Sequence, residues 1–155
     1  VGRMGGVNIV RLPATLHPAA VDLWAACGLT RPWNDPLSDL TRALDGPTST
    51  VLAAVDGADL LGTVMVGYDG HRGWVYYLAV LPDSQGRGLG RALMAAAEAW
   101  LDERGVPKIQ FMVRADNRAV VTFYEHLGYV DQHVTVLGRF LDPQRQTLRE
   151  PTPAT

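Results

Sequence analysis

Three glycines alternate with other residues in the run Gln85-Gly86-Arg87-Gly88-Leu89-Gly90, at the point where a helical pattern begins. Glycine costs up to about 1 kcal/mol relative to alanine in a helix, so three of them need a reason. Without Cβ atoms, the N–H groups of a first helical turn can contact an anion, which the helix dipole also favours. Arg87 and Arg91 add positive charge. The run predicts a phosphate or pyrophosphate cradle; the alternative is a tight strand-to-helix turn without a ligand.

The two common nucleotide-binding patterns are absent from this run. A P-loop needs a lysine after its last glycine, and the only lysine of the chain is Lys108. A dinucleotide fingerprint needs glycine at its sixth position, where this chain has Arg91. The run therefore indicates a phosphate ligand of another class.

The elements around this run follow from apolar periodicity and turn residues. Residues 74–81 are apolar and rich in β-branched and aromatic side chains, which predicts a strand. From Arg91 to Arg104 apolar residues recur at three- and four-residue steps, which predicts a helix. Similar patterns predict further strands over 7–12, 49–55, 60–68, 108–113, 129–133 and 134–140, and helices over 18–28, from 35 or 38 to 44, and over 117–127.

This order predicts an α/β (α+β) fold. We expect a single mixed, mostly antiparallel sheet of six or seven strands, flanked by about four helices. A ligand should lie at the carboxyl end of the strand over 74–81, against the helix that follows it. We expect residues 1–6 to be a disordered start or a cloning remnant, residues 7–141 to form the domain, and residues 142–155 to be a flexible tail.

Composition narrows the class of protein. The 155 residues are 47% hydrophobic and 19% charged, with a net charge of −2. These values predict one globular domain and argue against a nucleic-acid binder with a large basic face. We expect no membrane partner, no metal, and a cytoplasmic monomer or homodimer with the single Cys27 as a core residue.

Two ordered motifs resemble one known family. The run from Val80 to Leu93 (VLPDSQGRGLGRAL) is similar to the acetyl-CoA pyrophosphate motif of the GNAT superfamily of N-acetyltransferases. A second block from Asn117 to Tyr129 (NRAVVTFYEHLGY) follows at the family's distance. The resemblance covers about residues 7–140. Residues 31–36 and 67–73 further resemble the bacterial YpeA-type members, whose substrates are poorly defined.

The resemblance implies acetyl-CoA as cosubstrate and a GNAT fold. Tyr124 would be the general acid that protonates the departing CoA thiolate, and Asn117 would bind the pantetheine arm. From the residues alone, Asn117 is equally a plain helix N-cap, and Tyr124 could be an aromatic residue at the edge of the core. The cofactor-binding residues that the resemblance implies are Leu78, Ala79, Val80, Gln85, Gly86, Arg87, Gly88, Leu89, Gly90, Asn117 and Tyr124.

No general base is carried over from the family. Ribosomal-protein N-terminal acetyltransferases have a glutamate where this chain has Met112, and residues 74–81 contain no carboxylate. His71 can take a proton near neutral pH, and Asp69 could orient its ring. The alternative is that both are only turn residues.

Two short segments, residues 31–35 and residues 69–72, are dense in functional side chains. Together they predict an acceptor pocket between them. Trp33 would form an apolar wall, Asp35 and Asp69 could attract an ammonium group, and Arg72 could bind a carboxylate. The alternative is two ordinary surface turns. The predicted substrate residues are Trp33, Asn34, Asp35, Asp69, Arg72 and Tyr76.

These features predict an enzyme that moves the acetyl group of acetyl-CoA to an amine by direct attack in a ternary complex. The expected acceptor is a small or amino-acid-like molecule. The alternatives are a protein N-terminal or lysine acetyltransferase, and a CoA-binding module without catalysis.

Overall fold

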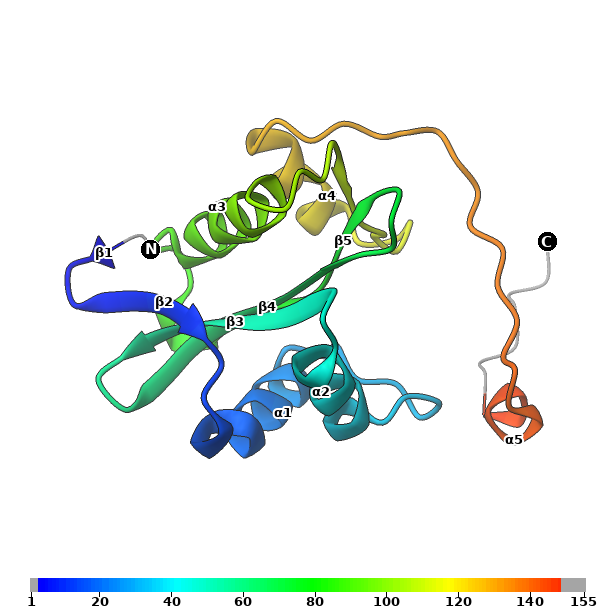
Figure 1. The fold of residues 1–155 in the computed structure, drawn as a ribbon, viewed down its shortest axis with the longest axis horizontal. Coiled ribbons are helices and arrows are strands. Elements are labelled where there is room, and N and C mark those ends of the chain that lie inside the picture. The colour runs from blue at the N-terminus through cyan, green and yellow to red at the C-terminus, as the bar shows by residue number, and fades with distance from the viewer. Residues whose placement is uncertain (1–2, 149–155) are drawn as a thin grey trace. The chain divides into compact units, whose positions relative to one another are not determined.

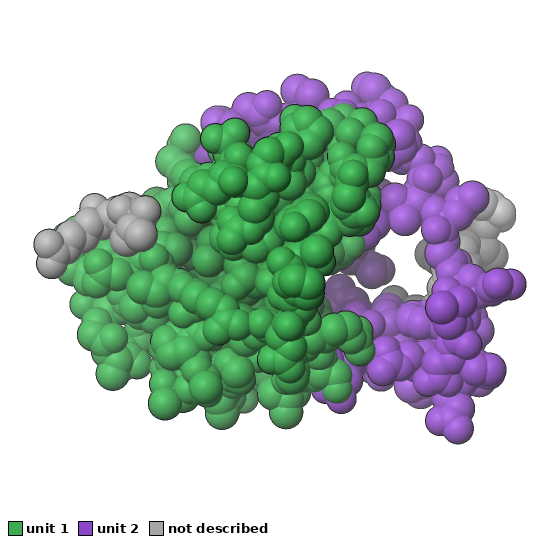
Figure 2. Space-filling model, viewed as in Figure 1, with its two compact units in different colours: residues 1–30, 36–111 green, residues 31–35, 112–155 purple. Residues whose placement is uncertain are grey.

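The computed structural model describes residues 3–148 (Figure 1). The helices and strands are β1 (Arg3–Met4), β2 (Val7–Arg11), α1 (His17–Ala26), α2 (Pro36–Asp45), β3 (Ser49–Asp56), β4 (Asp59–Tyr68), β5 (Gly73–Val80), α3 (Leu89–Asp102), β6 (Ile109–Gln110), α4 (Arg118–His126) and α5 (Pro143–Thr147). The chain divides into two compact units, residues 1–30 with 36–111 and residues 31–35 with 112–155 (Figure 2).

The first unit holds one six-stranded sheet in the order β1-β2-β3-β4-β5-β6. All neighbouring strands are antiparallel except β5 and β6, which are parallel. Helices α1 and α2 cover one face of the sheet and α3 covers the other (Figure 1). The prediction of a single mixed, mostly antiparallel sheet with helices on both faces is confirmed.

Apolar residues at helical and alternating spacing build the core on each face of this sheet. On α3, one stripe is buried, as its periodicity predicts: Leu89, Leu93, Met94, Ala97 and Leu101. On the other face, Trp24 of α1 and Leu40 of α2 are completely buried against the sheet. The burial of its apolar stripe holds α3 against the sheet. This packing also fixes the position of the N-terminus of α3, which follows β5.

The strand predictions were wrong at the C-terminal end. Residues 129–133 and 134–140 form no strand, and the strand predicted over 108–113 shrinks to Ile109–Gln110. Val134 and Leu137 are 75% and 89% exposed, so these β-branched and apolar side chains have no sheet face to pack on. A strand persists only where a neighbour takes its backbone hydrogen bonds, and within residues 129–140 none does.

Two segments near the ends of the chain contain short elements that were not predicted. Residues 3 and 4, predicted to be part of a disordered start, form β1 and pair with Asn8 and Val7 of β2. In the predicted flexible tail, α5 begins at an N-cap, Asp142, whose side chain accepts from the N–H of Gln144. Residues 1–2 and 149–155 of these predictions lie outside the described part. Within residues 3–148, five of the seven predicted strands form, β1 was not predicted, and there are five α-helices where about four were expected.

Between residues 3 and 148, no helix is both long and apolar enough to cross a membrane. Within the same range, no group of three or more His, Cys, Asp or Glu side chains is placed to hold a metal ion.

Candidate active site

Strand β5 contains a β-bulge in its middle. Thr63 of β4 is paired with Ala79, but Met65 is paired with Tyr76, so the single residue between them faces both Tyr77 and Leu78. Tyr77 accommodates the extra residue with a φ of 51°. A left-handed conformation costs a bulky L-residue roughly 1–2 kcal/mol. The bulge bends β5 immediately before its C-terminal end.

Among the described residues, no strand pairs with the second edge of β5 beyond Trp74. Strand β6 pairs with β5 only at Gly73 and Trp74. The predicted backbone-binding residues Leu78, Ala79 and Val80 lie in the part of β5 that β6 does not reach. The carbonyl of Val80 accepts from the Cys27 thiol at 3.4 Å and from the Gln85 side-chain amide at 3.2 Å. The open edge and the glycine run are therefore joined through Gln85.

The glycine run itself forms an exposed loop that ends in the N-terminus of α3. Gly86 and Gly88 both have positive φ, 76° and 79°, and Gly88 is the N-cap of α3. A Cβ at Gly86 would point into open space. The N–H groups of Leu89, Gly90 and Arg91 belong to the first turn and have no acceptor within the helix, and Gly88 has no side chain with which to cap them. These donors, with the exposed Arg87 and Arg91, fit an anionic group.

The hairpin between β4 and β5 uses Asp69 differently from the expectation. One Asp69 oxygen accepts the backbone N–H groups of His71 and Arg72, each at 2.8 Å, and the other accepts the Trp74 indole N–H at 2.9 Å. These hydrogen bonds, led by that from Arg72, hold the pKa of Asp69 at about 2. The His71 ring is exposed, and its Nδ1 lies 3.5 Å from a guanidinium nitrogen of Arg72. Asp69 thus fixes the turn and does not orient the His71 ring.

Tyr76 lies on β5 one residue before the bulge and is 45% exposed. Partial burial, and secondarily the charge of Asp69, raises the pKa of its phenol. Tyr76 therefore remains neutral over the ordinary pH range and can offer a hydroxyl to a ligand.

The second unit holds the other predicted residues. Asn117 is the N-cap of α4, and its side chain accepts from the N–H of Val120 at 3.4 Å. Burial raises the pKa of Tyr124 to about 12, and its ring is in edge contact with the rings of Phe123 and Tyr129. Within residues 31–35, the N–H of Asn34 closes a turn on the carbonyl of Arg31. The N-cap interpretation of Asn117 is therefore correct, and the roles of Trp33, Asn34 and Asp35 toward a substrate stay predictions.

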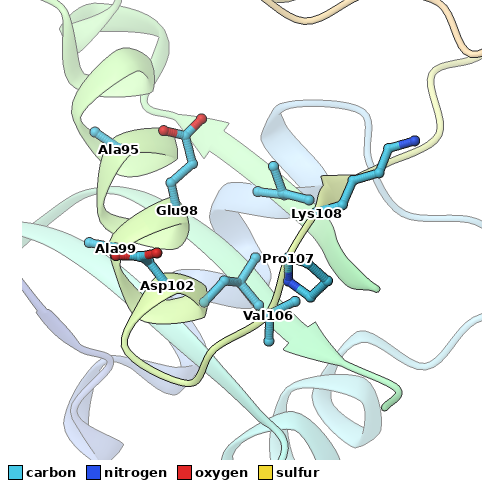
Figure 3. Close-up of a pocket in the computed structure, with 9 residues that line it drawn as sticks. Ala95, Glu98, Ala99, Asp102, Val106, Pro107 and Lys108 are labelled. Carbon is cyan, nitrogen blue, oxygen red and sulfur yellow. The ribbon is translucent and has the colours of Figure 1, made fainter. Parts of the chain in front are cut away.

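A groove of about 420 Å³ lies elsewhere on the first unit, along the C-terminal half of α3 (Figure 3). It is lined by Ala95, Glu98, Ala99, Leu101, Asp102, Val106, Pro107, Lys108 and Ile109. None of the residues predicted for binding or catalysis lines it. The groove is therefore separate from the glycine loop.

Four residues beside the bulge were missed: Trp24, Asp39, Thr63 and Tyr77. They contact one another through stacking and hydrogen bonds. Each is an ordinary helix or strand residue in the sequence. The only available signal was the pair Tyr76-Tyr77, two large aromatic residues in succession within an apolar strand.

Comparison with known proteins agrees with this geometry. The profile of the Acetyltransferase (GNAT) family matches residues 18–129, which include the bulge, the glycine loop and α4. The chain belongs to the GNAT acetyltransferase family. It is 46% identical over 128 residues to an acetyltransferase of Pectobacterium atrosepticum, over 83% of this chain and 91% of that protein.

Two solved GNAT-like structures show the same fold. The aminoglycoside N-acetyltransferase AAC(6')-Iy in complex with CoA has a TM-score of 0.76 at 17% identity, covering 92% of this chain and 99% of that chain. The ribosomal-protein-S18-alanine N-acetyltransferase of Escherichia coli has a TM-score of 0.66 at 25% identity, covering 79% and 76%. The protein from Pectobacterium atrosepticum and a further acetyltransferase, from Yersinia enterocolitica at 50% identity, are bacterial relatives, and the assignment of this chain to the YpeA type stays a prediction.

Proposed function

We propose that this protein transfers the acetyl group of acetyl-CoA to the amine of a small or amino-acid-like acceptor by direct attack in a ternary complex. The observation that carries the proposal is the exposed loop with Gly86 and Gly88 at positive φ, which ends in the uncapped first turn of α3 beside the open edge of β5. Family membership and the CoA complex of a protein with the same fold support it.

The chain's own groups supply recognition of the donor. The first-turn N–H groups of α3 and the two exposed arginines would bind the pyrophosphate, and the edge of β5 at Leu78–Val80, which β6 does not reach, would bind the pantetheine as an added strand does. A backbone N–H of this edge could also hydrogen-bond the thioester oxygen where negative charge develops.

The reaction needs two proton transfers. The amine nitrogen forms a bond to the acetyl carbon, the carbon–sulfur bond breaks, the amine loses one proton, and the thiolate gains one. Tyr124 is our proposed donor to the thiolate, because burial raises the pKa of its phenol to about 12 and so keeps the proton on it at neutral pH. His71 is our proposed proton acceptor, acting without Asp69 as its partner.

One observation favours a second candidate, a CoA-binding module without catalysis. Asp69 is committed to the hairpin turn, so the proposed base is not backed by a carboxylate. Release of free thiol from acetyl-CoA across a library of amines separates the two candidates. CoA binding with no thiol release for any amine would favour the module.

The donor site is tested by a matched pair of substitutions at Gly88. Asn and Asp both tolerate the left-handed conformation and have the same shape, but only Asp adds a negative charge. We expect Gly88→Asn to retain much of the CoA affinity in calorimetry and Gly88→Asp to lose most of it. Equal CoA affinities in both folded variants and the wild type would place the site elsewhere.

A further inference from the structure

Four side chains from four elements meet at the β5 bulge: Trp24 of α1, Asp39 of α2, Thr63 of β4 and Tyr77 of β5. Trp24 and Thr63 are completely buried. All four lie in the first unit. Thr63 and Tyr77 contact Trp24 and Asp39, which belong to the two helices that cover one face of the sheet (Figure 1). This cluster of hydrogen-bonded side chains is called the bulge cluster below.

The hydroxyl of Thr63 is the centre of the bulge cluster. It accepts a hydrogen bond of 2.8 Å from the Trp24 indole N–H and donates one of 3.1 Å to the backbone carbonyl of Tyr77. A threonine hydroxyl has a single hydrogen to donate, and here that hydrogen goes to the residue with positive φ. Thr63 therefore ties the bulge directly to α1.

The side chain of Tyr77 is held at two further points. Its ring stacks on Trp24 with the ring centroids 3.9 Å apart and the planes at 13°. Its hydroxyl donates a hydrogen bond of 2.8 Å to Asp39 Oδ2 on α2. The backbone, ring and hydroxyl of one residue are thus each fixed by a different group. A non-glycine residue stays at positive φ only where its surroundings determine it this strongly.

The bulge decides which way the end of β5 points. A bulge bends its strand and increases the local twist, and without the extra residue every side chain on one side of it would change face. Leu78, Ala79 and Val80 follow Tyr77 directly, and the carbonyl of Val80 is joined to Gln85 of the glycine loop. Whatever fixes Tyr77 therefore fixes the open edge of β5.

We propose that the bulge cluster is a positioning device for the acyl-donor site, with Thr63 and Tyr77 as its positioning residues. By holding Tyr77 in the left-handed conformation, it directs the backbone of Leu78–Val80 toward the donor. The proposal rests on the proposed function, because it assigns the same donor site a support in α1 and α2. It adds that side chains remote from the donor control catalysis through the backbone of β5.

The test compares Thr63→Val with Thr63→Ser. Valine has nearly the same shape but removes both hydrogen bonds, whereas serine keeps the hydroxyl. The matched control is Thr50→Val on β3 of the same sheet, because the buried Thr50 hydroxyl has no hydrogen-bond partner among the described residues. Amide resonances of ¹⁵N-labelled protein are followed during titration with CoA, and thiol release from acetyl-CoA is measured with the best amine of the library.

In the wild type, Thr63→Ser and Thr50→Val proteins, we expect CoA to shift the amides of residues 78–80 and of residues 86–90. In Thr63→Val, the shifts at 86–90 should remain and those at 78–80 should be lost. Displacement of a reacting group by about 1 Å can lower the rate roughly 100-fold, so kcat should fall by about 10- to 100-fold with a much smaller change in KM for acetyl-CoA.

Wild-type shifts at residues 78–80 in Thr63→Val would overturn the positioning role while leaving the donor site intact. No shift at residues 86–90 in the wild type would overturn the proposed function and the positioning role with it. If Thr63→Val does not fold, Tyr77→Phe replaces it, since it removes the hydroxyl that donates to Asp39. An unchanged response at residues 78–80 in Tyr77→Phe would likewise overturn the proposal.

Discussion

The carboxylate of Asp69 and the indole of Trp74 are joined by a hydrogen bond of 2.9 Å across the hairpin between β4 and β5. The other oxygen of Asp69 accepts the N–H groups of His71 and Arg72, so both carboxylate oxygens are hydrogen-bonded within the turn. The turn that carries His71 therefore has a fixed backbone, and the His71 ring stands on it exposed. This arrangement favours a base that acts alone or through water.

Acid titration checks this role of Asp69. Its folded pKa of about 2 lies below the ordinary aspartate value of about 3.9. The ionised form is therefore the one the fold favours: its stabilisation is complete above about pH 3.9 and is lost as pH falls through about 2. We expect the Trp74 indole proton resonance to titrate with a midpoint near 2. Asp69→Asn is the control and should abolish this titration; a wild-type midpoint near 3.9 would contradict the assignment.

Removal of the Tyr124 hydroxyl checks the general acid. Tyr124→Phe should lower kcat by about 10²–10⁴-fold, as loss of a general acid does, with little change in CoA affinity. The neighbouring aromatic substitution Tyr129→Phe is the control and should retain activity. Turnover at the wild-type rate in Tyr124→Phe, with chemistry shown to be rate-limiting, would reject the role.

The raised pKa of Tyr124 has its own consequence at alkaline pH. Because the folded value of about 12 exceeds the ordinary value of about 10, the neutral phenol stabilises the fold below pH 10, and this contribution is lost as pH rises through about 12. The phenolate absorbance at 295 nm should therefore show one tyrosine titrating about two pH units late in the wild type. The same late titration in Tyr124→Phe would assign it to another tyrosine.

The parts of this protein that the sequence predicted depend on local signals. Asp56-Gly57 between apolar runs predicted the β3–β4 hairpin, and three alternating glycines predicted the exposed loop before α3. The bulge was not predicted, because Tyr77 owes its conformation to partners such as Asp39, 38 residues away. The strands expected over 129–140 failed for a related reason: β propensity cannot show whether a neighbouring strand edge is present.

The buried hydroxyl of Thr50 offers a test of stability. Its residue is 5% exposed and its Oγ1 has no hydrogen-bond partner within residues 3–148. A buried polar group without a partner costs about 1–3 kcal/mol, and valine fills nearly the same space on a strand. We expect Thr50→Val to raise the free energy of unfolding by about 1 kcal/mol, seen as a higher urea midpoint with an unchanged m-value. A lower midpoint would show that the hydroxyl is satisfied.

Gly62 of β4 is paired with Val80 at the end of β5. A Cβ at this position would lie 2.8 Å from the backbone oxygen of Ala79 and 3.0 Å from Leu93 Cδ1. Leu93 could rotate, but the Ala79 oxygen belongs to the main chain of β5 and can move only with the strand. We expect Gly62→Ala to lower the free energy of unfolding by about 1–3 kcal/mol, as overpacking a core does. Because Ala79 belongs to the open edge, CoA affinity should fall as well.

Gly138→Ala is the control for Gly62→Ala. A Cβ there would meet nothing within 4 Å, and Gly138 does not have positive φ. Its urea midpoint and CoA affinity should match the wild type, with a stability change within about 0.5 kcal/mol. Both variants are compared in urea unfolding and in calorimetric titration with CoA. Wild-type stability of Gly62→Ala would mean that β5 can move without lowering the free energy of unfolding. Reduced stability with wild-type CoA affinity would show that the packing of Ala79 does not affect the donor site.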